Sequence, residues 1–155
     1  MDTSALTEIK QLFKDGQDDF KQGDFDSALE TFQEILNRFR DAGNSEGMAE
    51  SSYQLAMCQI KLGFYQDAIM NLKEALELFR FLKKHERIAI TLHALGIIHA
   101  ELEDDEIATK YLDEAKSSYR EKNSPVGEGS VLFELGNISF KDNALEEATA
   151  YYEKK

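Results

Sequence analysis

The stretch YQLAMCQIKLGFYQDAIMNLKEAL, residues 53–76, contains two apolar patterns of helical spacing that meet at a glycine. Before the glycine, apolar side chains follow the i, i+3, i+4, i+7 spacing of an amphipathic helix, at Tyr53, Ala56, Met57 and Ile60. After Gly63 a second series begins at Tyr65 and continues through Leu72. The stretch therefore predicts two amphipathic helices joined by a short turn. Neither helix can bury its apolar face without a neighbour.

The same pattern returns every forty residues along the chain, without insertion or deletion. Alanine recurs at Ala28, Ala68, Ala108 and Ala148; a small residue at Gly16, Ala56, Gly96 and Gly136; and a large apolar residue at Phe32, Leu72, Leu112 and Tyr152. The small residues should let the two helices of each pair approach closely. A period of this length predicts stacked helix pairs, that is, an all-α, right-handed solenoid of about four helix-turn-helix repeats.

The repeats are expected over residues 4–43, 44–83, 84–123 and 124–155, as one solenoid domain over 1–155. Eight antiparallel helices are expected, over 4–22, 25–41, 45–62, 65–81, 86–102, 105–121, 125–142 and 145–155. Asp24 and Asp104 are suitable N-caps for the second helices of their repeats. Ser124 followed by Pro125 is typical of the first turn of a helix.

Two stretches, residues 53–76 quoted above and FELGNISFKDNALEEATAYY at 133–152, resemble the tetratricopeptide repeat. The family pattern is leucine-glycine in the first helix, glycine and an aromatic residue at the turn, and alanine in the second helix. The forty-residue repeat is longer than the usual ~34 residues and is similar to that of Pins-type scaffolds, kinesin light chains and Rap-type bacterial receptors. The first repeat departs from this pattern because it has Asp15 in place of the leucine. The third repeat has Glu103 and Asp105 in place of the turn glycine and the aromatic residue. The resemblance implies that the first helices line a concave groove for a peptide or partner segment.

The composition is that of a soluble protein, and the net charge of -12 disfavours several classes of partner. A protein that follows nucleic-acid phosphates needs a basic surface, so we expect no nucleic acid. An anionic membrane surface is disfavoured for the same reason. No apolar run approaches the ~20 residues of a membrane span, and the N-terminus lacks a signal-peptide pattern. We expect a cytoplasmic protein.

The sequence contains no pattern typical of catalysis or cofactor binding. His93 and His99 are six residues apart and do not share a helix face. Cys58, the single cysteine, has no basic neighbour in sequence, so we interpret it as a packing residue. The acidic run at 101–106 lacks the glycine and ligand spacing of a calcium loop and suits the start of a helix. We therefore expect no enzyme, no cofactor and no metal site.

The candidate groove follows from the implied concave surface and the shared register of the first helices. It consists of the residues three before, one after and five after each small position: Phe13, Gln17, Lys21, Tyr53, Met57, Lys61, His93, Ile97, Phe133, Asn137 and Lys141, with Glu101 replacing the lysine in the third repeat. The aromatic residues either face a ligand or pack against the neighbouring first helix, and they can do both. The lysines either form a positive track or stabilise helix C-termini.

One subtype of the family holds chaperone tails by their carboxylate, but its binding positions are not matched. Those positions carry Phe13, Gln17, Gln54, Ile90 and Ala94 in this chain. Binding of such tails is therefore not expected.

The sequence predicts a protein-interaction module that binds a protein or peptide. The alternative is an N-terminal sensory or regulatory region of a larger signalling enzyme or transcription regulator, and a third possibility is self-association. The first three repeats run on to Arg40, Arg80 and Arg120, whereas the fourth stops short of that position. We therefore expect the N-terminal part of a longer protein, with a last helix that frays or packs against another copy.

Overall fold

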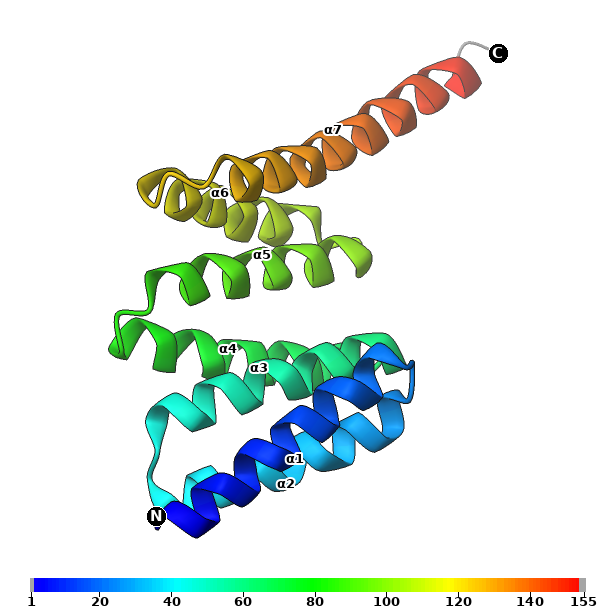
Figure 1. Cartoon of the computed structure of the whole chain (residues 1–155). Coiled ribbons are helices and arrows are strands. Elements are labelled where there is room, and N and C mark those ends of the chain that lie inside the picture. Colours follow the sequence, from blue (N-terminus) through cyan, green and yellow to red (C-terminus); the bar gives the residue numbers. More distant parts are fainter. Residues whose placement is uncertain (1, 154–155) are drawn as a thin grey trace. The chain divides into compact units, whose positions relative to one another are not determined.

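The structure is a computed structural model that describes residues 2–153. Its helices are α1 (Thr3–Lys21), α2 (Phe25–Ala42), α3 (Ser45–Leu62), α4 (Tyr65–Phe81), α5 (His85–Glu101), α6 (Asp105–Glu121) and α7 (Pro125–Glu153), as Figure 1 shows. No strand occurs among the described residues. The all-α fold of helix-turn-helix repeats is confirmed. The predicted boundaries of the first six helices, and the start of the seventh, lie within one residue of those observed.

The helix ends follow from local hydrogen bonding. The Asp24 carboxylate accepts a hydrogen bond from the backbone N–H of Ser27 at 3.3 Å, and the Ser124 hydroxyl accepts one from Gly127 at 3.4 Å. These two caps are confirmed. Asp104 is the N-cap residue of α6, but its side chain makes no capping hydrogen bond; the carboxylate lies 3.6 Å from Nδ1 of His99 instead.

Left-handed residues turn the chain between helices. Gly23, Gly43 and Gly63 have φ angles of 83°, 66° and 82°, a conformation that glycine adopts without steric cost. The later turns use other residues, Lys83, Glu103 and Asn123, with φ between 53° and 60°. The forty-residue register is therefore kept even where glycine is missing.

The chain falls into two compact units: unit 1 up to Arg87 and unit 2 from Ile88. In unit 1, α2 and α3 supply most of a core that includes Phe32, Leu36 and Leu55, all at most 1% exposed. In unit 2, the fully buried side chains include Leu95 on α5 and Leu112 on α6. The small positions of the first and third repeats work as expected, because a Cβ atom added at Gly16 would lie 2.9 Å from the ring of Phe32, and one at Gly96 2.6 Å from Leu112. The expectation is wrong at Gly136, where a Cβ atom would meet nothing within 4 Å.

The prediction of eight helices is wrong in one respect: the last two are a single helix, α7. Where the earlier turns have glycine at 23 and 63, this position has Asn143, and where Asp24 and Asp104 begin the second helices, it has Ala144. Alanine is the strongest helix former and cannot cap, so the turn lacks the residues that would stop the helix. The last two residues of the predicted eighth helix, 154–155, lie outside the described residues.

Candidate functional site

An open cavity of about 520 Å³ lies in unit 1 between α1 and α3, the first helices of the first two repeats. The α1 side consists of Leu6, Ile9, Lys10 and Phe13. The opposite side consists of Phe39 at the end of α2, Asn44 in the turn, and Glu46, Gly47 and Glu50 on α3. The walls are mainly apolar, with three charged side chains among them.

The apolar part of the cavity is rigidly held. Ile9 is 2% exposed and belongs to the core of unit 1. Phe13 meets the buried ring of Phe32 edge-on, with the ring centroids 5.3 Å apart. These contacts hold the side chains of Ile9 and Phe13, so this part of the cavity wall is formed without a ligand.

Gly47 allows the ring of Phe39 to line the cavity. A Cβ atom at Gly47 would lie 2.4 Å from atoms of that ring, closer than packed side chains come. The backbone N–H of Gly47 donates to the side chain of Asn44 at 2.9 Å, which caps α3. The glycine and its cap together keep the first turn of α3 directly against Phe39.

The two carboxylates of the cavity already have cationic partners. Oε1 of Glu46 lies 3.3 Å from Nζ of Lys84, and Oε2 of Glu50 lies 2.9 Å from a guanidinium nitrogen of Arg87. The Arg87 guanidinium carbon also lies 4.7 Å from the centroid of the Tyr53 ring and 5.3 Å from that of Phe79. Cation–π contacts at this distance are favourable, so Arg87 is held by one carboxylate and two rings.

The predicted groove residues of unit 1 are only partly brought together. Phe13 lines the cavity, and Tyr53 packs under Arg87. Gln17, Lys21 and Lys61 are exposed, and Met57 is half-buried. The other residues of the cavity, Lys10 and Phe39 above all, are absent from the prediction. The prediction used only three positions of each repeat. A comparison of the remaining positions between repeats would have found both residues.

In unit 2, Asn137 and Lys141 line a second, smaller cavity of about 190 Å³ between α5 and α7. His93 packs edge-on against Tyr119 of α6 at 6.0 Å, and burial lowers the pKa of its imidazole. The ring thus packs within its own repeat. Ile97 is half-buried, whereas Phe133 is 67% exposed.

Lys141 does not lie at a helix C-terminus, because α7 continues to Glu153. Its Nζ donates to Oδ1 of Asp105 at 3.0 Å, and this hydrogen bond raises the pKa of Lys141. The interpretation of Lys141 as a residue that stabilises the end of a helix is therefore wrong. Lys21 and Lys61 do lie in the last turns of α1 and α3.

The side chains of Cys58 and His99 are both buried. Cys58 is fully buried, and burial raises the pKa of its thiol to about 11. His99 stacks on Tyr111 with the ring centroids 5.5 Å apart. Within residues 2–153, no three His, Cys, Asp or Glu side chains are grouped so as to hold a metal ion. Nor does any helix in this range combine the length and apolarity of a membrane span.

The fold and the cavity define the class of the protein: helix pairs repeat in register, and neighbouring first helices present a surface hollow. Models of the tetratricopeptide repeat match residues 47–121 and residues 12–42. The chain belongs to the tetratricopeptide repeat family. Among curated proteins, no match is found.

Solved structures with the same fold have low sequence identity to the chain. Aspartyl phosphate phosphatase F from Bacillus subtilis is similar with a TM-score of 0.83 and 17% identity, over 96% of this chain and 39% of that structure. A Rap protein complexed with competence and sporulation factor gives 0.77 and 20%, over 95% and 42%. The TPR2AB domain of yeast Sti1, in a pHSP90 complex, gives 0.73 and 20%, over 94% and 51%. The chain spans less than two thirds of each of these structures.

Proposed function

We propose that the chain is a protein-interaction module that binds a peptide or a segment of a partner protein on the surface of its first helices. The observation that carries this proposal is the open, mainly apolar cavity of about 520 Å³ between α1 and α3. A hollow with fixed apolar walls and a few polar groups is the usual form of a binding site. The predicted groove residues Asn137 and Lys141, at the smaller cavity of unit 2, are proposed as further contacts.

The similar structures support this kind of function. The Rap protein was solved with competence and sporulation factor, and the Sti1 domain with a pHSP90 partner. Binding rather than catalysis also agrees with the packing of Cys58 and His99. A thiol with a raised pKa is a poor nucleophile at neutral pH.

A second candidate is the repeat region of a larger regulatory protein. The coverage favours it, since the chain corresponds to 39% of the phosphatase F structure. In that case the cavity would couple ligand binding to a further domain. Sequencing of the complete reading frame tests this candidate, and an open reading frame without a second domain would contradict it.

The interaction function is tested by affinity capture and mass spectrometry with the wild-type chain and two variants of matched exposure. Leu6→Glu puts a charge on the wall of the cavity, at a residue that is 37% exposed. Leu102→Glu makes the same change at a residue that is 38% exposed and lies after α5. We expect Leu6→Glu to lose a captured partner that Leu102→Glu retains. A partner that binds both variants like the wild type would contradict a site between α1 and α3.

A further inference from the structure

The repeat following the cavity provides an internal comparison, because each position has an equivalent forty residues later. There, within unit 1, two ion pairs join α3 to the residues that follow α4: Lys84 with Glu46 at 3.3 Å, and Arg87 with Glu50 at 2.9 Å. One repeat earlier, the residues equivalent to Lys84 and Glu46 are Asn44 and Leu6. Those equivalent to Arg87 and Glu50 are Gly47 and Lys10. Neither pair can form, and the cavity is open.

The two aromatic residues, by contrast, are present in both repeats. Tyr53 and Phe79 flank the guanidinium of Arg87, and their equivalents, Phe13 and Phe39, line the cavity. The cavity therefore has two aromatic rings equivalent to those that flank Arg87. At the position equivalent to Arg87 it has Gly47, which has no side chain to fill the space between them. A side chain from another molecule can occupy that space.

The charge of the site is reversed between the two repeats. Lys10 stands at the register of Glu50, so an occupant meets an ammonium group where Arg87 meets a carboxylate. Glu46 and Glu50 also line the cavity, but Lys84 and Arg87 neutralise them. Lys10 is exposed, and no ion pair involves it within residues 2–153. At physiological salt, charges more than about 8 Å away are largely screened. The ammonium group of Lys10 therefore determines which charge on a ligand is favoured at the cavity.

We propose that the cavity binds an apolar-acidic segment of a partner protein. An aromatic or branched aliphatic side chain lies between Phe13 and Phe39, and an adjacent Asp or Glu side chain pairs with Lys10. The inference rests on the proposed function and specifies the chemistry of its partner. An ion pair with an exposed side chain such as Lys10 is expected to change affinity by about two- to fivefold.

The test uses three hexapeptides that differ at one residue and are acetylated and amidated, so that they carry no terminal charge. Each contains leucine, followed by glutamate, glutamine or lysine, within a glycine-serine frame. Amide chemical shifts of the complete ¹⁵N-labelled chain at ~0.15 M salt report both the affinity and the place of binding. We expect shifts at Gly47 and Phe39, with the glutamate peptide bound about two- to fivefold more tightly than the glutamine peptide.

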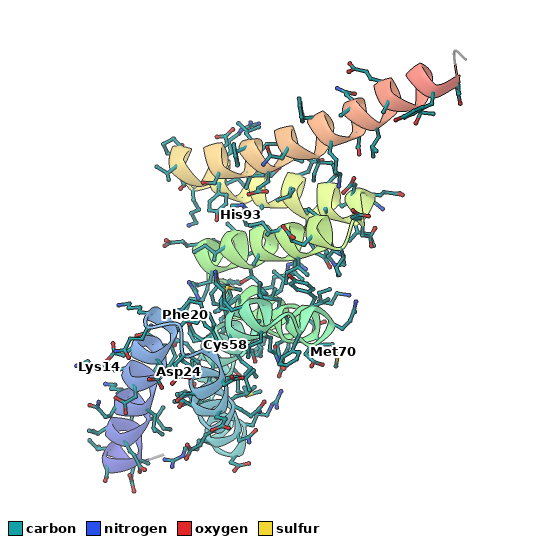
Figure 2. All side chains as sticks on the ribbon, turned by 90° about the vertical axis from the view of Figure 1, so that its right-hand side faces the viewer. Lys14, Phe20, Asp24, Cys58, Met70 and His93 are labelled. Atoms are coloured by element: carbon teal, nitrogen blue, oxygen red, sulfur yellow. The ribbon has the colours of Figure 1, made fainter. Side chains whose placement is uncertain are left out.

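Lys10→Glu should invert the preference in favour of the lysine peptide. The control is Lys14→Glu, because Lys14 is exposed on the same helix (labelled in Figure 2) and does not line the cavity. It should keep the preference of the wild type. Well-dispersed amide spectra of both variants show that they are folded.

Tighter binding of the lysine peptide, equal binding of all three, or no shifts at the cavity would each overturn the inference. The proposed function is judged separately, by loss of a captured partner in Leu6→Glu. A captured partner with a basic contact segment would leave that function standing and contradict only the acidic chemistry.

Discussion

A Cβ atom at Gly96 would lie 2.6 Å from the side chain of Leu112, which is fully buried. The first and second helices of the third repeat therefore touch through a glycine. In three helix pairs the first helix has a small residue at the position of Gly96, and the second has a large apolar residue at the position of Leu112. The distance between the paired helices therefore depends on these single residues. Substitutions at the glycines test this relationship directly.

Gly96→Ala should destabilise the protein by ~1–3 kcal/mol, because Leu112 must move to make room. The control is Gly136→Ala on α7, at the same register, where a Cβ atom would meet nothing within 4 Å. There we expect a gain of about 0.5–1 kcal/mol from better helix propensity. Chemical denaturation of both variants measures the difference, and equal effects would mean that the contact with Leu112 is unimportant.

Leu95→Ala should cost ~2–5 kcal/mol, from lost burial and from the cavity that remains. Leu95 is fully buried on α5, whereas Leu132 on α7 is 49% exposed and serves as the control. Leu132→Ala should change the unfolding free energy by ~0.5 kcal/mol or less. A loss below ~1 kcal/mol for Leu95→Ala would contradict its place in the core.

The thiol of Cys58 should react very slowly with a disulfide reagent at pH 8. With its pKa raised to about 11 by burial, only about one molecule in a thousand carries the thiolate at that pH. The control places a cysteine at Met70, which is 70% exposed, in a Cys58→Ala background; Figure 2 shows the two positions. We expect Met70→Cys to be modified rapidly in the folded protein, and Cys58 only after unfolding. Fast reaction of the native Cys58 would refute its burial.

The pH dependence of stability should include a contribution from His93. Burial lowers the pKa of His93 below its ordinary value of 6.5, so the unfolded chain binds the proton more readily. This contribution is present above pH 6.5 and is lost as the pH falls towards the folded-state pKa. Urea unfolding between pH 7.5 and 5 should therefore show a smaller loss of stability for His93→Phe than for the wild type. Identical pH profiles would exclude this role of the imidazole.

The apolar side chains of α7 should promote self-association. Phe133 and Phe140 are 67% and 77% exposed and lie seven residues, or two turns, apart on one face. Light scattering should show a mass that rises with concentration, and the double variant Phe133→Lys, Phe140→Lys should abolish the rise. Phe81→Lys on α4, also at a 77% exposed residue, should leave it unchanged. A monomer at all concentrations would contradict the expectation.

The sequence predicts most of the fold because a single register repeats it. Helix ends agree to within one residue where glycine or a capping residue marks them. The sequence pattern does not predict that the last two expected helices form the single helix α7. Asn143 is a residue type common in turns, whereas Ala144 favours a continuous helix. At this position the local preference for helix and the forty-residue period disagree, and the prediction followed the period.

The candidate site is harder to predict, since it depends on differences between repeats. Only Phe13 among the predicted residues lines the cavity between α1 and α3. The pairing of Arg87 with Glu50 joins residues 37 positions apart, and no short pattern signals it. The first repeat has Gly47 and Lys10 at the positions of that pair, and a search for shared residues does not detect such a difference.

The single helix α7 has a consequence for how its second half moves. Every residue from 142 to 150 is exposed, so this segment of α7 buries little side-chain surface. The end of a helix that buries little apolar surface opens locally at low cost in free energy, and helix–coil exchange takes about a microsecond or less. We therefore expect the amides of this end of α7 to exchange with solvent faster than those of α3.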